Sequence, residues 1–143
     1  MNKEVVTKSA QETQQIGKKL AGTTKGGEVL LLFGDLGAGK TTFMQGFAEG
    51  LGIFQRIISP TFIIMRSYDV GGKVQKLYHI DLYRTESGSD LEGLGMKEIL
   101  QDKHAVVAIE WPEKLGSLLP EKRIEVNLTV ISEDERKIEI EKL

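Results

Sequence analysis

Apolar and polar positions along the chain follow two different periods, and the changes of period mark the expected elements. Ser9-Ala10-Gln11-Glu12 predicts a helix start, because a Ser hydroxyl and a Glu three residues later can satisfy each other's unpaired amides. Ile16 and Leu20 continue at helical spacing, and Gly22 is expected to end this helix. Glu28–Phe33 is apolar on both faces, which predicts a strand buried beneath helices.

The remaining pattern alternates strands with helices in the same way. A helix is expected from about Gly39 to Leu51. Thr61–Val70 and Lys73–Tyr83 flank Gly71-Gly72, a dipeptide that tolerates the positive φ of a two-residue turn, so they predict an antiparallel hairpin. Further elements are expected over Asp90–Leu100 (a short helical region), Ala105–Ile109 (an apolar strand), Pro112–Leu119 (a short helix), and Arg123–Ile131 and Arg136–Leu143 (alternating strands).

Length and composition narrow the class of protein. The 143 residues fit one domain, 1–143. The sequence contains no cysteine, which excludes a thiol nucleophile, a Cys-ligated zinc and a secreted disulfide scaffold. A cytoplasmic protein is expected, because apolar runs such as Val29–Phe33 are too short to span a bilayer and Met1–Lys8 is not followed by a signal-peptide core. The chain has 19 Lys and Arg residues and 21 Asp and Glu residues. This near balance of charge argues against a protein that binds nucleic acid by general neutralisation of its phosphates.

The segment Gly34-Asp35-Leu36-Gly37-Ala38-Gly39-Lys40-Thr41 matches the phosphate-loop pattern G-x-x-x-x-G-K-[ST], and it lies between an expected strand and an expected helix. Its glycines let the backbone curl into a nest of N–H groups for phosphate oxygens. Lys40 would supply a cation for the β and γ phosphates, and the Thr41 hydroxyl would replace a water on phosphate-bound magnesium. The alternative is a glycine-rich turn that only connects strand to helix, but the full pattern in this context favours phosphate binding.

Glu110 directly follows the apolar strand Ala105–Ile109, where a phosphate-loop protein carries the carboxylate that serves its magnesium ion. A solvated loop residue is the alternative interpretation. Trp111, the only Trp, comes next. It is a candidate for stacking or for partner contact, with core packing as the alternative.

Asp81 is the second acidic candidate. Strand alternation puts His79, Asp81 and Tyr83 on one face, and Ile80 and Leu82 on the other, where they would face the core. Asp81 could position the attacking water or bind metal. A structural hydrogen bond between His79 and Asp81 is the alternative.

Three further features bear on nucleotide chemistry. Ser59-Pro60-Thr61-Phe62 could act as a switch that senses the γ-phosphate, or it could be a plain helix-to-strand turn. The guanine-reading N-K-x-D element is missing, since Asn2-Lys3 is followed by Glu4-Val5 in an N-terminal tail, so adenine is favoured. Candidates for an arginine finger are Arg56, Arg66 and Arg84.

These motifs, in this order, resemble the TsaE (YjeE) family of bacterial ATPases required for threonylcarbamoyladenosine modification of tRNA. The resemblance rests on Ser9 with Thr13, Gly34–Thr42, Ser59-Pro60-Thr61-Phe62, His79-Ile80-Asp81-Leu82-Tyr83-Arg84 and Glu110-Trp111-Pro112-Glu113. It implies an α/β, three-layer P-loop NTPase-like fold with a mixed, mainly parallel central sheet plus antiparallel hairpins.

The resemblance also implies ATP and Mg²⁺ as ligands, with Thr41 and Glu110 on the metal. Asp81, Lys40 and Glu110 would be the catalytic residues, with Asp81 needed for hydrolysis. The implied nucleotide-binding residues are Thr13 on the adenine side, Gly37, Ala38, Gly39, Lys40, Thr41, Thr42, and Arg136 as a C-terminal contact.

In the family, the protein joins TsaB and TsaD, and its ATP hydrolysis resets that transferase complex, so tRNA contact would come through the partners. Two other functions stay open on the residues alone. One is a small-molecule or nucleotide kinase, although no Arg-rich lid segment follows Thr41. The other is a non-catalytic module in which ATP only orders a partner-binding segment.

Overall fold

The computed structural model describes residues 2–35, 37–58, 64–84 and 95–143. These residues form a seven-stranded mixed sheet in the order β1-β7-β6-β2-β5-β4-β3. The strands are β1 (Asn2–Thr7), β2 (Val29–Phe33), β3 (Met65–Asp69), β4 (Lys76–Asp81), β5 (Ala105–Glu110), β6 (Ile124–Val130) and β7 (Arg136–Lys142). The helices are α1 (Ala10–Ala21), α2 (Lys40–Gly50), α4 (Met96–Leu100) and the 3-10 helix η1 (Pro112–Leu118).

The strand pairings are half parallel and half antiparallel within the described residues. β4 with β5, β5 with β2, and β2 with β6 are parallel. β1 with β7, β7 with β6, and β3 with β4 are antiparallel. The expected mainly parallel sheet is therefore only partly parallel, because an antiparallel ribbon extends each side of a parallel centre.

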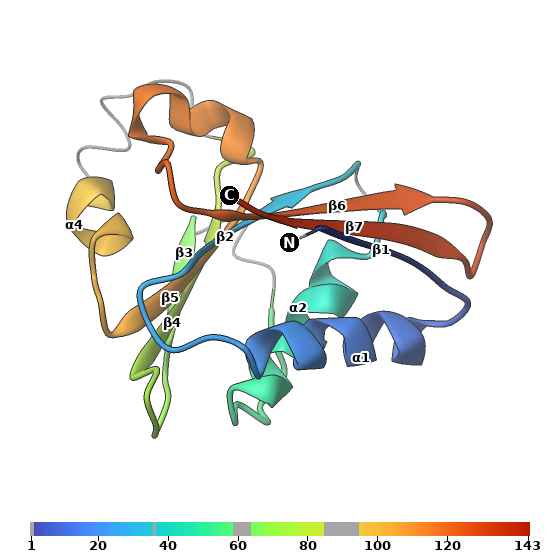
Figure 1. The fold of residues 1–143 in the computed structure, drawn as a ribbon, viewed down its shortest axis with the longest axis horizontal. Helices are drawn as coiled ribbons and strands as arrows, with labels where there is room; N and C mark the ends of the chain where they lie inside the picture. Colours follow the sequence, from blue (N-terminus) through green and yellow to red (C-terminus); the bar gives the residue numbers. More distant parts are fainter. Residues whose placement is uncertain (1, 36, 59–63, 85–94) are drawn as a thin grey trace.

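Two apolar clusters bury opposite faces of the central strands. One joins α1 and α2 to alternate residues of the sheet, including Leu30 and Leu32 of β2, and the other joins α4 and η1 to Leu31 and Ile109. Figure 1 shows α1 and α2 together on one side of the sheet and α4 on the other. Because β2 and β5 are covered on both faces, their sequences read as continuous apolar runs. Within the described part of the chain, no helix combines the length and apolarity needed to cross a membrane.

The first helix begins where its capping residues predict. The Ser9 hydroxyl accepts a hydrogen bond from the Glu12 amide (3.1 Å), while the Glu12 carboxylate accepts one from the Lys8 amide (2.9 Å). The reciprocal half of the expected capping box therefore reaches one residue further back than Ser9. Glu12 still accepts a hydrogen bond from a backbone amide just before the helix.

Glycines let α1 and α2 approach each other closely. A Cβ added to Gly46 of α2 would overlap the backbone of Gln14 in α1, and one added to Gly17 would overlap the Phe43 carbonyl oxygen. This close crossing brings the N-terminal half of α1 toward the first turn of α2.

Two local expectations were wrong. The N-terminal tail is strand β1, which pairs along its length with β7, because Val5 packs against the core while its neighbours stay exposed. The β3–β4 hairpin is confirmed, but its turn is wider than two residues. The last backbone hydrogen bond before the turn runs from the Val70 amide to the Gln75 carbonyl oxygen (2.9 Å). Neither Gly71 nor Gly72 has a left-handed φ, and Val74 turns inward as part of the core.

The helical expectation over Asp90–Leu100 is confirmed only as α4, and residues 90–94 lie outside the described residues. The expected helix at Pro112 is a 3-10 helix with non-helical backbone at Gly116. The buried strands and the two C-terminal strands follow their predicted ranges within one or two residues.

Candidate functional site

The phosphate-loop segment connects β2 to α2, as the sequence predicts. Gly34, Gly37 and Gly39 have φ of 154°, 82° and 99°, conformations that side-chain-bearing residues rarely adopt. A Cβ on Gly34 would also lie 2.9 Å from the Leu128 carbonyl oxygen. The glycines are thus required by the backbone path, which carries the chain into the N-terminus of α2 at Lys40.

Lys40 points back along the loop and is only 6% exposed. Its ammonium group donates to the Gly34 carbonyl oxygen (2.7 Å) and lies 4.5 Å from the centroid of the Trp111 ring. A buried ammonium needs such partners, because leaving water without them is costly. Trp111 has φ 58°, a left-handed conformation that is unusual for a residue with a side chain, and its ring is partly buried beside Tyr83 (centroids 4.9 Å apart).

The candidate acids lie at the carboxyl ends of neighbouring parallel strands. Asp81 of β4 pairs in register with Glu110 of β5, and Glu110 pairs with Leu32 of β2, two residues before Gly34. Ligands of open α/β sheets bind outside this edge. The side chains of Asp81 and Glu110 are both buried, with 4% exposed in each case.

His79 contacts Glu110 rather than Asp81. The His79 Nε2 and Glu110 Oε2 atoms are 2.7 Å apart, and the imidazole is fully buried. The Asp81 carboxylate accepts a hydrogen bond from the Tyr83 amide (2.9 Å). The expected facing of this strand is confirmed for Ile80 and Leu82, which pack in the apolar cluster on the other face of the sheet.

A second group of predicted residues surrounds a pocket of about 220 Å³ beside the loop. Thr13, Gly39, Thr42 and Arg136 line it, together with Ala10, Glu133 and Asp134. The Thr13 hydroxyl shares a buried hydrogen bond with the Thr7 hydroxyl (2.7 Å). Ala10, Glu133 and Asp134 are pocket residues that the sequence motifs do not predict. The two acids have one signal in the sequence, their place close to Arg136.

Arg136 ties the loop to the turn between β6 and β7. Its Nε donates to the Ala38 carbonyl oxygen (3.1 Å) and its Nη2 to the Gly37 carbonyl oxygen (3.3 Å). Its Nη1 donates to the carbonyl oxygens of Ser132 (2.9 Å), Glu133 (3.1 Å) and Glu135 (2.9 Å). These contacts give Arg136 a structural role in shaping the loop, in addition to its position in the pocket wall.

Other predicted residues are exposed, lie on a neighbouring strand, or fall outside the described residues. Thr41 is exposed in the first turn of α2, and Arg56 and Arg84 are exposed as well. Arg66 is the cross-strand neighbour of His79, with a buried Nε that lacks a hydrogen-bond partner among the described residues. Residues 59–63, which include the expected switch segment, lie outside the described residues.

The donor set suits a magnesium ion that arrives with phosphates. No group of three or more His, Asp and Glu side chains in the described residues could hold a metal by itself. Mg²⁺, however, is usually bound through one or two carboxylates together with substrate phosphates and water. Glu110 fits this pattern, since only Oε2 of its carboxylate has a hydrogen-bond partner among the described residues.

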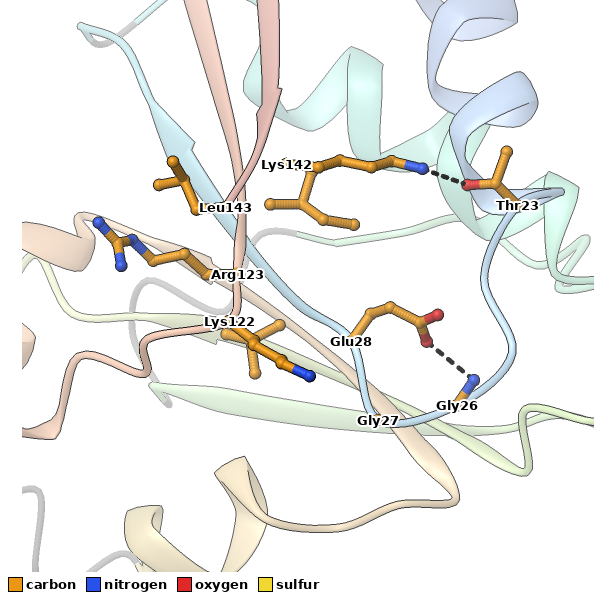
Figure 2. A pocket seen from close by; sticks show the side chains of 10 residues that line it. Thr23, Gly26, Gly27, Glu28, Lys122, Arg123, Lys142 and Leu143 are labelled. Carbon is orange, nitrogen blue, oxygen red and sulfur yellow. Dashed lines mark hydrogen bonds between the residues drawn. The ribbon is translucent and has the colours of Figure 1, made fainter. Parts of the chain in front are cut away.

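A pocket of about 360 Å³ lies at the other ends of these strands (Figure 2). It is lined by residues that begin β2 and β6 and by the basic side chains of Lys122, Arg123 and Lys142. The Glu28 carboxylate there accepts from the Gly26 amide (2.8 Å). None of the predicted site residues belongs to this pocket, so the candidate chemistry is confined to the opposite edge of the sheet.

Known proteins resemble this chain over nearly its whole length. The family model "Threonylcarbamoyl adenosine biosynthesis protein TsaE" matches residues 7–138. The tRNA threonylcarbamoyladenosine biosynthesis protein TsaE of Bacillus subtilis is 45% identical over 132 residues, covering 92% of this chain and 80% of its own. That of Treponema pallidum is 38% identical over 135 residues, covering 94% and 97%.

Structural similarity agrees with the sequence comparison. The crystal structure of Bacillus subtilis YdiB superposes with a TM-score of 0.77 at 38% sequence identity, covering 98% of this chain and 84% of that one. The loop, the paired strand-end acids and these matches agree on one assignment. The chain belongs to the TsaE family of threonylcarbamoyl adenosine biosynthesis proteins.

Proposed function

We propose that this protein is a cytoplasmic Mg²⁺-dependent ATPase of tRNA threonylcarbamoyladenosine biosynthesis, built as a single three-layer P-loop domain. The observation that carries the proposal is the position of Lys40. Its ammonium lies between the Gly34 carbonyl and the Trp111 ring, beside the strand end that bears Glu110. A buried cation held at the mouth of a nest of backbone amides is a receptor for phosphate groups.

In this proposal the loop amides of Gly37 to Thr42 cradle the phosphates, and the ammonium of Lys40 transfers from the Gly34 carbonyl to the β and γ phosphates. Thr13 and Arg136 line the pocket that takes the nucleoside side of ATP. Thr41 and Glu110 would hold Mg²⁺, which when bound supplies charge neutralisation for the phosphates.

Asp81 would orient the attacking water. The water oxygen bonds to the γ-phosphorus, the bond from that phosphorus to the β–γ bridging oxygen breaks, and ADP and phosphate leave. Asp81 suits this role because its carboxylate is buried, is steadied by the Tyr83 amide, and lies in register with Glu110.

Partners follow from the family. In this proposal the protein acts with TsaB and TsaD, its hydrolysis resets that complex, and tRNA is contacted through it. The relatives' shared name supports the common process, tRNA threonylcarbamoyladenosine biosynthesis. Slow turnover in isolation is expected, because Arg136, the arginine that contacts the loop, donates its N–H groups to backbone carbonyl oxygens. A partner would then supply the arginine that stabilises the transition state.

The test measures Mg-ATP binding by calorimetry and phosphate release, with and without TsaB and TsaD. The parent should bind Mg-ATP and release ADP and phosphate faster with the partners. Lys40→Ala should abolish binding, and Asp81→Asn should keep binding but lose turnover. A phosphorylated acceptor would indicate a kinase instead, and cellular function retained by Asp81→Asn would indicate a nucleotide sensor.

A further inference from the structure

The buried pair of His79 and Glu110 is a short polar contact that the proposed chemistry leaves unexplained. The two side chains come from neighbouring parallel strands, and their Nε2 and Oε2 atoms are 2.7 Å apart. His79 is 0% exposed and Glu110 4% exposed. His79 lies opposite Ala108, so its ring reaches diagonally along β5 to the last residue of that strand.

The chemistry of the pair fixes which atom donates. A carboxylate only accepts hydrogen bonds, so the hydrogen between the two groups is carried by the imidazole Nε2. The other ring nitrogen, Nδ1, is buried and has no hydrogen-bond partner among the described residues. Within the described part of the chain, Glu110 is therefore the hydrogen-bond partner that orients the ring. An unsatisfied buried atom costs about 1–3 kcal/mol, so this arrangement is not one that stability by itself would favour.

The two acids at this edge are restrained in different ways. The Asp81 carboxylate accepts a hydrogen bond from the amide of Tyr83, two residues further along the chain. Glu110 has a longer side chain with more rotamers to lose, and its restraint comes from a residue 31 positions away. Without His79, the Glu110 carboxylate would have no hydrogen-bond partner among the described residues.

We propose that His79 is a positioning residue: it fixes one oxygen of the Glu110 carboxylate, which leaves the other oxygen aimed at a phosphate-bound divalent cation. This inference rests on the proposed function, because it assigns Glu110 to the cation. Carboxylates that bind metals are commonly held by such outer hydrogen bonds, and losing one typically weakens metal affinity or activity about 10–100-fold.

The experiment compares two amides of different reach in place of the imidazole. His79→Gln puts an N–H donor near the position of Nε2, whereas His79→Asn puts it near Nδ1, too short to reach Glu110. Each protein is titrated with ATP in EDTA and again with excess Mg²⁺, and the ratio of the two dissociation constants gives the gain from the metal. Thermal unfolding of each variant reports stability separately.

We expect the parent and His79→Gln to show similar metal gains, and His79→Asn to lose about 10–100-fold of that gain while binding metal-free ATP like the parent. Glu110→Gln should lose the gain as well, and adding His79→Asn to it should cost little more. Equal metal gains in all His79 variants would overturn the inference. So would a loss shared equally by metal-free ATP, because that pattern indicates a purely structural role.

The parent protein separates this inference from the function on which it rests. If the parent bound ATP in neither buffer, the proposed function itself would be wrong. If the parent bound ATP in both buffers with the expected metal gain, only the His79 assignment would be at stake. Should His79→Asn fail to fold, His79→Ala takes its place, alone and combined with Glu110→Gln. A coupled pair predicts that the double variant has nearly the metal gain of Glu110→Gln alone, and additive losses would overturn the inference.

Discussion

At the scale of single residues, the candidate site depends on cations that already have partners in the protein. The Lys40 ammonium donates to a backbone carbonyl oxygen and lies over an indole ring. The Arg136 guanidinium donates to five backbone carbonyl oxygens. Hydrogen bonds from charged donors are worth more than neutral ones. Both cations therefore stabilise the loop. In the proposed function Lys40 is the one that moves to the phosphates, because its ammonium gives up one carbonyl acceptor whereas Arg136 would give up five.

Replacing Arg136 tests its role in shaping the loop. Arg136→Met should lower the free energy of unfolding by about 1.5–3 kcal/mol, because the Gly37 and Ala38 carbonyls lose a charged donor. Lys137→Met is the matched control: its ammonium lies 3.8 Å from Glu4 and Glu139 on the surface, so a change within about 0.5 kcal/mol is expected. Urea unfolding measures both, and equal destabilisation of the two variants would contradict the role given to Arg136.

At the scale of elements, the crossing of α1 and α2 decides where the first helix stands relative to the loop. The glycines on both helices remove the Cβ atoms that would hold the helices apart. Thr13 of α1 can then line the same pocket as Thr42 of α2. A sequence prediction finds both helices from their periodicity, but it assigns no purpose to a glycine inside a helix, which by propensity alone is unfavourable.

Gly46→Ala should destabilise the fold by about 1–3 kcal/mol, because the new methyl group meets the Gln14 backbone and the helices must separate. Helix propensity acts in the opposite direction and favours Ala by about 1 kcal/mol. Gly71→Ala is the control, since a Cβ there meets nothing within 4 Å. Urea unfolding would refute the crossing if Gly46→Ala were the more stable variant.

At the scale of the whole molecule, the sheet separates two pockets at its opposite edges. The predicted phosphate and metal residues gather where β2, β4 and β5 end, while the basic pocket of Figure 2 lies where β2 and β6 begin. Changes at the second edge should therefore leave nucleotide binding intact. The apolar clusters on both faces join the two edges into one folded unit, so a ligand at either edge stabilises the whole.

Mg-ATP at 100 times its dissociation constant should raise the free energy of unfolding by about 2.7 kcal/mol, which corresponds to a rise in Tm on the order of 5–10 °C. Lys40→Ala should lose this rise, and Lys122→Ala, a change in the opposite pocket, should keep it. Thermal unfolding with and without Mg-ATP measures the shift. A rise of the same size in Lys40→Ala would show that the nucleotide binds elsewhere.

The sequence by itself determined the features that depend on near neighbours in the chain: the buried strands, the capped first helix, the hairpin, and the glycine-rich loop with Lys40 and Thr41. Periods of 2 and 3.6 and a local motif carry that information. The tertiary structure alone decided that His79 binds Glu110, that Arg136 reaches the loop across 98 residues, and that the first strand joins β7. The reason is register: strand pairing sets which side chains meet at the edge of a sheet, and a pattern of apolar and polar positions fixes the face of each residue but not its neighbour on the next strand.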